Sequence, residues 1–208
     1  MSEHGGASGR LDPALRDLVE RLVDERVAAR LDGLTTKVEE ALGRLGGLER
    51  AVVPEQASIL VFSGDLDRLM SAFIIANGAV AMGLEVSMYF TFWGLVALKK
   101  RTSYAGKTVE AKLLAAMLPG GPSEVGTSKM HMLGMGPIMF KRMMAQQNVE
   151  TLPGLIAVAR ELGVKLIACQ MARGVMGIRE DELIAGVEFG GVATYLGDAI
   201  QSKVTLFI

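Results

Sequence analysis

The chain has 208 residues, half of them hydrophobic, with a formal net charge of −1 and a mean hydropathy of +0.34. This length suffices for one domain with its own core plus an appendage. The near-neutral charge and the lack of a basic tract argue against a nucleic-acid partner. No stretch of the sequence reaches the roughly 18 consecutive apolar residues that a membrane-spanning helix needs. Membrane association is therefore not predicted, although the sequence does not exclude it.

The first residues carry no targeting signal that we can identify. Residues 1–10 are small and polar, and we expect them to be disordered. They lack the basic and apolar stretches of a signal peptide. The chain has one cysteine, which cannot form an internal disulfide. A reducing, cytoplasmic compartment is therefore expected.

Residues 11–50 are predicted to form a helical arm. Asp12 and Pro13 suit the start of a helix. Apolar residues then recur at helical spacing, and from Val27 to Leu48 their steps alternate between four and three, which is typical of a coiled coil. We expect this stripe to pack on a partner helix and to hold a homo-oligomer together. The alternative is an amphipathic arm that lies on its own domain.

A main domain is expected over residues 57–208, after a linker at about 49–56. Strands are predicted over 57–62 and 85–91, with a largely apolar helix over 66–82 between them. This βαβ pattern favours an α/β fold with a mostly parallel sheet and helices on both faces. The other expected elements are helices over 95–100, 151–162, 179–184 and 190–201 and strands over 165–171 and 204–208.

The turn after the first of these strands holds two candidate substrate-binding residues, Gly64 and Asp65. In open α/β sheets, ligands bind at the carboxyl ends of strands. A phosphate held at the start of the following helix is the alternative. The carboxylates of Asp65 and Asp67 would repel such an anion, which argues against nucleotide binding.

Residues 101–150 are expected to form an irregular insertion that is rich in methionine. Methionine side chains suit adaptable surfaces, so a mobile lid over the cysteine, or an oligomer contact, is predicted. The alternative is a soft-metal site, since thioether, imidazole and thiolate ligands together suit Cu(I). No spacing matches a recognised metal motif, and neither a bound metal nor a cofactor is predicted. The lid residues are Met130, His131, Met132 and Met135.

Cys169 ends the apolar run of residues 165–171, where a buried strand is predicted to give way to a loop. Reactive groups gather at such strand ends. A thiolate there would be favoured by the cation of Arg173 and by backbone amides of residues 171–177, with Gln170 beside it. We therefore expect Cys169 to be partly exposed with a lowered pKa. The alternative is an inert thiol that packs as a small hydrophobe.

Other cysteine chemistries find little support in the composition. A two-cysteine peroxidase within one chain is excluded, because there is no second thiol to resolve the oxidised one. A Cys-His-Asp hydrolase has little support as well, since His4 lies in the polar first ten residues and His131 in the irregular segment. Any disulfide or persulfide formed at Cys169 must therefore be handed on to a thiol of another molecule.

Several motifs in the main domain occur together in one order. They are Phe62-Ser63-Gly64-Asp65-Leu66-Asp67, Tyr89-Phe90-Thr91-Phe92-Trp93-Gly94, Leu166-Ile167-Ala168-Cys169 with Met176-Gly177-Ile178, and Gly190-Gly191-Val192-Ala193-Thr194-Tyr195-Leu196-Gly197. With them, residues 57–208 resemble the DsrE/DsrF-like family, in its longer branch that is often labelled peroxiredoxin-like. The arm lies outside this resemblance.

The resemblance implies a three-layer DsrE-like fold of the flavodoxin or Rossmann type, and a homo-oligomer. It also implies a sulfur carrier or sulfurtransferase, in which Cys169 holds a persulfide or thiosulfonate. The acceptor would be the thiol of a sulfur-carrier partner, TusA-like or rhodanese-like. The alternative is a non-catalytic oligomeric assembly protein.

Overall fold

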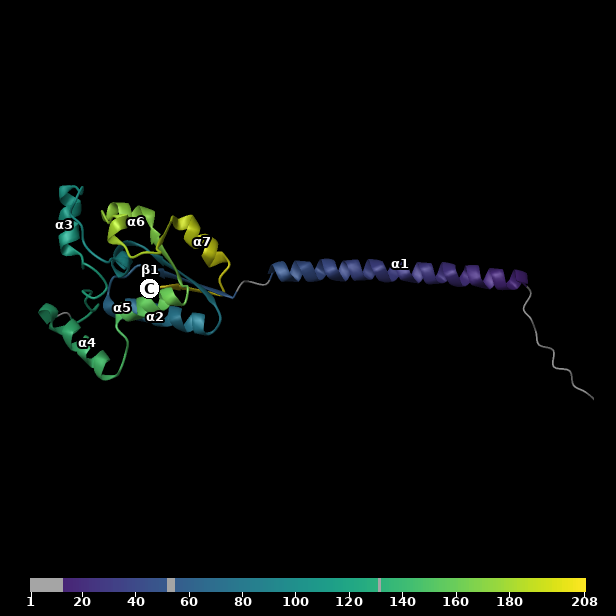
Figure 1. Ribbon diagram of the computed structural model, residues 1–208, viewed down its shortest axis with the longest axis horizontal. Coiled ribbons are helices and arrows are strands. Elements are labelled where there is room, and N and C mark those ends of the chain that lie inside the picture. Colours follow the sequence, from purple (N-terminus) through teal and green to yellow (C-terminus); the bar gives the residue numbers. More distant parts are fainter. Residues whose placement is uncertain (1–12, 52–54, 131) are drawn as a thin grey trace, which may run out of the picture. The chain divides into compact units, whose positions relative to one another are not determined.

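The computed structural model describes residues 13–51, 55–130 and 132–208 (Figure 1). The chain divides into two units, residues 1–52 and 53–208. The predicted disorder of residues 1–10 lies outside the described residues. In the first unit, α1 (Pro13–Ala51) confirms the predicted long helix, and its side chains through residue 43 are exposed. Among the described residues, no helix is long and apolar enough to cross a membrane.

The second unit is built on one parallel sheet with the strand order β4-β3-β2-β1-β5. Helices α2 (Leu66–Ala81) and α5 (Leu152–Glu161) lie on one side of it, and α6 (Gln170–Val175) and α7 (Val192–Ile200) on the other (Figure 1). The predicted three-layer α/β fold is confirmed. The strands are β1 (Gln56–Val61), β2 (Glu85–Phe90), β3 (Lys165–Cys169), β4 (Glu188–Gly190) and β5 (Val204–Phe207).

The core lies where the central strands meet α2 and α5. Strands β1, β2 and β3 are buried over most of their length because a parallel sheet is covered on both faces. From α2, the ring of Phe73 stacks on that of Phe90 in β2, with centroids 5.9 Å apart. Helix α5 begins after Thr151, whose hydroxyl accepts a hydrogen bond from the Gly154 N–H, as expected of an N-cap.

The segment over 101–150 is more regular than the sequence predicted. It contains α3 (Val109–Met117), a short 3₁₀ turn η2 (Met132–Gly134) and α4 (Met135–Gln146). The hydroxyl of Thr108 caps α3 by accepting a hydrogen bond from Ala111 N–H. Both helices are short and are separated by irregular stretches, so their helical spacing was not recognised in the sequence.

Four smaller features of the fold also differ from the predictions. Residues Phe92–Leu98 form a 3₁₀ helix, η1, in place of the helix expected over 95–100. Strand β3 ends at Cys169, because α6 starts at the next residue. Residues Glu180–Glu182 form a single 3₁₀ turn, η3. Strand β4 is only three residues long and was not predicted.

Candidate functional site

Cys169 is the last residue of β3, and the side chains that follow neighbouring strands lie around it. In the sheet, β3 is flanked by β2 and β4, with Ala168 paired to Phe90 and Cys169 paired to Gly190. Thr91, which follows Phe90, is thereby brought level with Cys169. Because parallel strands end at the same edge, the predicted position of the thiol at the carboxyl edge is confirmed.

Cys169 is buried, so the expectation of a partly exposed thiol is wrong. Only 5% of the residue is accessible. Helix α6 follows the strand without a loop, and the Tyr89 side chain from β2 lies beside the thiol. The ring of Tyr195 from α7 packs on Tyr89 with centroids 5.6 Å apart. These neighbours close the space that a loop would have left open.

The thiolate of Cys169 is nevertheless favoured. Burial raises the pKa of the thiol, but hydrogen bonds from the Tyr89 hydroxyl, the Ala172 N–H, the Thr91 hydroxyl and the Met171 N–H outweigh it. The net pKa of Cys169 is lower than that of an ordinary thiol. The predicted amides after the strand do contribute, through Met171 and Ala172.

Tyr89 is the first of these side-chain donors. Burial, and then the neighbouring Cys169, raise the pKa of Tyr89, so its hydroxyl stays protonated and able to donate. In the structure the Tyr89 hydroxyl also donates to the Gly190 carbonyl, over 3.3 Å. That contact is longer than the usual O–H···O distance of about 2.7–2.8 Å. The Tyr89 hydroxyl can therefore rotate and donate its one proton to the Cys169 thiolate instead.

Arg173 interacts with groups other than the Cys169 thiol, and a thiolate-stabilising role for it stays a prediction. Its guanidinium lies 3.3 Å from the Glu180 carboxylate, donates to the Ile178 carbonyl over 3.4 Å and stands 5.2 Å from the Phe189 ring centroid. Arg173 is not among the largest effects that shift the pKa of Cys169. The guanidinium of Arg173 therefore interacts with the start of η3 and with β4. Gln170 is exposed at the first position of α6.

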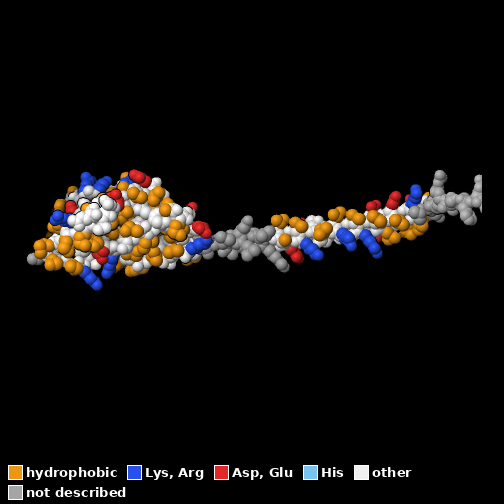
Figure 2. Space-filling model, turned by 90° about the horizontal axis from the view of Figure 1, so that it is seen from below, with side chains coloured by type: hydrophobic (Ala, Val, Ile, Leu, Met, Phe, Trp, Pro, Cys, Tyr) orange, Lys and Arg blue, Asp and Glu red, His pale blue; other side chains and the backbone are white. Residues whose placement is uncertain are grey.

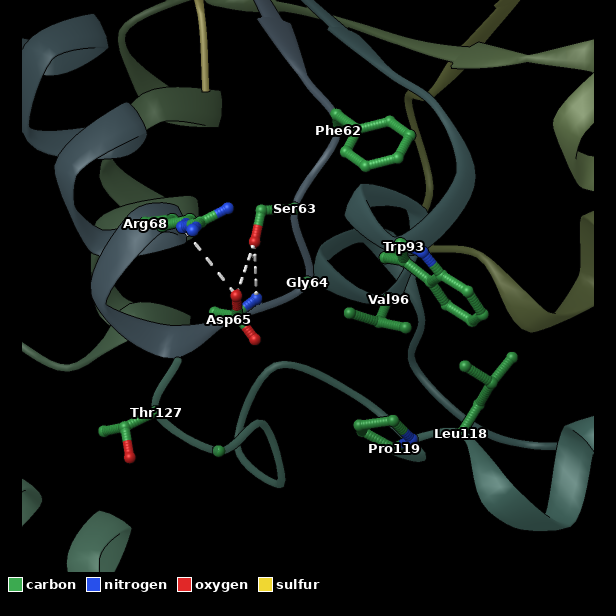
Figure 3. Close-up of a pocket in the computed structure, with 11 residues that line it drawn as sticks. Phe62, Ser63, Gly64, Asp65, Arg68, Trp93, Val96, Leu118, Pro119 and Thr127 are labelled. Carbon is green, nitrogen blue, oxygen red and sulfur yellow. Dashed lines mark hydrogen bonds and ion pairs between the residues drawn. The ribbon is translucent and has the colours of Figure 1, made fainter. Parts of the chain in front are cut away.

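Gly64 and Asp65 line a different hollow, at the end of β1 (Figure 3). Its volume is about 320 Å³, and Trp93 and Arg68 also line it. Asp65 accepts a hydrogen bond from the Ser63 hydroxyl over 3.0 Å and lies 3.8 Å from Arg68 Nε. Cys169 does not line this pocket. A substrate-binding role for Gly64 and Asp65 stays a prediction.

The methionine segment also lies away from the thiol in the described structure. Helix α4 is on the side of α2 and α5, whereas α6 is on the opposite side (Figure 1). Met130 lines a shallow hollow with Asp67 and Ser128, and Lys141 on α4 donates to the Ser123 carbonyl. His131 lies outside the described residues, and Met132 and Met135 are exposed. A lid over Cys169 therefore stays a prediction that would require this segment to move or to come from another copy.

A model of the DsrE/DsrF/DrsH-like family matches residues 54–207. The chain belongs to this family. The resemblance found in the sequence is thus confirmed, and α1 lies outside the matched residues. Within the part of the chain that the structure describes, there is no group of three or more His, Cys, Asp or Glu side chains placed to hold a metal ion.

Two relatives and one solved structure are similar to this chain. The uncharacterized protein YrkE of Bacillus subtilis is 46% identical over 155 residues, covering 74% of this chain and 97% of YrkE. The sulfur carrier protein DsrE2 of Allochromatium vinosum is 33% identical over 163 residues, covering 74% of this chain and 98% of DsrE2. The ychN protein from E. coli has a TM-score of 0.45 at 13% identity, covering 74% of this chain and 99% of that chain.

Sequence reasoning missed Tyr89 and Thr91 as residues of the candidate site in this DsrE-like domain. Both belong to a motif that carried the family resemblance, but no role was assigned to them. Alternation along β2 indicates which side chains share a face. Only the order β4-β3-β2 shows that the end of β2 lies beside Cys169.

Proposed function

We propose that this chain is a sulfur carrier that holds sulfur on Cys169 and passes it to a partner thiol. The observation that carries the proposal is a buried thiol at the end of a central strand, with two hydroxyls and two backbone amides that stabilise its thiolate. A cysteine that served only as packing would not need four donors around its sulfur. Membership of the DsrE/DsrF/DrsH-like family, and a relative named as a sulfur carrier, support the same function.

The transfer requires no external oxidant when the donor already holds a sulfur–sulfur bond. The Cys169 thiolate attacks the outer sulfur of a persulfide R–S–SH, forming Cys169–S–SH and releasing R–S⁻. With tetrathionate as donor, attack on one of its two inner sulfurs breaks the central S–S bond, forms Cys169–S–S–SO₃⁻ and releases thiosulfate. In each case one S–S bond breaks and one forms, so the electrons balance.

Release follows the reverse pattern. An acceptor thiolate attacks the outer sulfur of the Cys169 persulfide, takes that sulfur and returns Cys169 as a thiolate. The acceptor belongs to another molecule because the chain has one cysteine. We propose a small sulfur-carrier protein of the TusA or rhodanese type for this role. The low exposure of Cys169 means that the short helix α6, or the Tyr195 ring beside Tyr89, must shift when the acceptor binds.

Intact-mass spectrometry tests the proposal. The reduced full-length chain is incubated with polysulfide and, separately, with tetrathionate, and then with excess dithiothreitol as a surrogate acceptor. We expect one sulfur or one thiosulfonate adduct on Cys169, removed by dithiothreitol, and none on Cys169→Ser. The Cys169→Ser variant also reports any oxidation of the methionines.

Two other results would count against a carrier. If the wild-type chain gains no adduct at a pH where the thiolate forms, Cys169 is packing and the assembly role is favoured. If the adduct forms but dithiothreitol does not remove it, the site traps sulfur and does not relay it.

The lid over Cys169 is a separate proposal with its own measurement. If residues 130–144 cover the loaded thiol, their amide hydrogen exchange should slow when Cys169 carries sulfur. If exchange slows only around α6 and α7, the cover consists of the elements that already surround Cys169.

A further inference from the structure

Helix α1 carries an apolar seam with the spacing of a coiled coil. The seam residues Val27, Leu31, Leu34 and Val38 are each between 49% and 59% exposed. Gly33 and Gly43 would each tolerate a Cβ, with no atom within 4 Å, and both lie on the outer side of the helix in this register. The glycines therefore lower the helix propensity without interrupting the seam.

We infer that the seam binds a second copy of this chain, with the two α1 helices parallel and in register. A repeat of steps of four and three is the pattern that places successive apolar residues against one neighbouring helix. The residues that flank the seam decide the direction. On one flank Arg30 and Lys37 recur one heptad apart, and the other flank holds Ala28, Thr35 and Leu42.

Parallel pairing separates like charges, whereas antiparallel pairing brings them together. In a parallel pair, each flank of one helix faces the opposite flank of its partner. Arg30 then faces Thr35, and Lys37 faces Leu42, where its long apolar stem can cover the leucine. In an antiparallel pair, the basic flank would face itself along its length. Figure 2 shows hydrophobic side chains recurring along α1, with Lys and Arg side chains along one side.

Thr35 is suited to a position beside the seam. Its hydroxyl already donates to the Leu31 carbonyl of the same helix over 2.9 Å. Covering this side chain by a second helix would therefore leave no unpaired hydroxyl, and its methyl group can pack. Because α1 leads into the second unit at its carboxyl end, a parallel seam joins two Cys169-bearing domains from the same end of the paired helices.

Disulfide trapping tests the direction of pairing in the full-length chain. In a Cys169→Ser background, single cysteines are introduced as Leu31→Cys, Val38→Cys and, on the outer face, Thr36→Cys. Each variant is equilibrated in a glutathione redox buffer, and the linked dimer is measured on a non-reducing gel. We expect linked dimer at Leu31→Cys and at Val38→Cys, each several-fold above Thr36→Cys.

The pattern of cross-links distinguishes the alternatives. In an antiparallel pair only one seam position can lie opposite itself, so cross-linking at one of the two seam sites alone would overturn the proposal. Equal cross-linking at all three sites would show random collision, and none at any site would show that α1 does not pair. Adding Thr35→Glu to the Val38→Cys variant should raise the linked fraction, because the new carboxylate faces Arg30 of the second copy. No increase would contradict the parallel register.

Discussion

The Cys169 thiol experiences two opposing effects on its ionisation. Burial disfavours the thiolate, while two hydroxyls and two N–H groups favour it. A hydrogen bond to a charged group contributes about 1.5–3 kcal/mol, so several such bonds can outweigh the loss of hydration at one sulfur. The Cys169 thiolate is therefore stabilised by oriented hydroxyl and N–H groups, whereas the guanidinium of Arg173 pairs with other groups.

The role of these donors can be measured by the pH dependence of alkylation. We expect the rate at Cys169 to rise with pH around a midpoint below about 8.5, the value of a free thiol. Tyr89→Phe should move the midpoint upward, because the thiolate loses a donor while the ring remains. Tyr195→Phe is the matched control and should leave it unchanged. A wild-type midpoint at or above the free value, or no shift in Tyr89→Phe, would contradict this account.

Among the elements, η1 lies unusually close to the end of β1, and two glycines allow it. A Cβ on Gly64 would meet the Trp93 carbonyl oxygen at 2.8 Å. A Cβ on Gly94 would overlap the Val61 carbonyl oxygen. The close approach lets the Gly94 N–H donate to the Phe62 carbonyl over 2.9 Å. Backbone contacts of this kind cannot be relieved by rotating a side chain.

Two glycine substitutions should therefore change stability in opposite directions. Gly94→Ala forces β1 and η1 apart, and we expect it to lower the free energy of unfolding by about 1–3 kcal/mol, as overpacking does. Gly78→Ala, in α2, has no atom within 4 Å of the new Cβ. It should raise that free energy by up to about 1 kcal/mol, since alanine is the better helix former. Urea unfolding measures both, and a neutral Gly94→Ala would show that η1 is free to shift.

Across the molecule, a buried carboxylate connects segments that are far apart in the chain. Glu182 is fully buried and accepts hydrogen bonds from the Ser103 N–H at 2.8 Å and the Arg179 N–H at 2.7 Å. It also pairs with Lys107 at 2.7 Å. Lys99, buried close by, donates to the Pro119 carbonyl over 2.8 Å. These contacts attach the segment after η1 to the segment after α6.

Glu182→Gln should destabilise the fold by about 3–5 kcal/mol at neutral pH, because it leaves the buried Lys107 cation unpaired. Burial raises the pKa of Glu182, but hydrogen bonds from Lys107, Arg179 and Ser103 outweigh it and hold the pKa below the ordinary 4.5. The stability that this group contributes is therefore present above 4.5 and is lost as pH falls through the lower folded pKa.

Urea unfolding at neutral pH and at progressively lower pH tests this. The wild-type chain should lose stability on acidification by more than Glu182→Gln does. Asp181→Asn, at an exposed neighbouring position, is the control and should lose little at neutral pH. If the wild type and Glu182→Gln lost the same free energy of unfolding as pH falls, Glu182 would not contribute to the pH dependence.

The local order of the chain was determined by its sequence. The period of the apolar residues predicted α1, α2, β1, β2 and β3, because burial on one face or both depends on spacing within one segment. The same reasoning placed Cys169 at the end of a buried strand. It failed for β4, which is too short to show a period, and for α3 and α4, which are short helices within a segment that otherwise lacks regular spacing.

The environment of Cys169 was decided only by the tertiary structure. Tyr89 is separated from Cys169 by tens of residues in the chain, and it lies beside the thiol because β2 pairs with β3. Tyr195, from α7, packs in turn on the Tyr89 ring. Arg173 is close in sequence, yet it pairs with Glu180 and lies over Phe189. Exposure and pKa depend on what fills the space around an atom, and strand order, which no local spacing encodes, sets those neighbours.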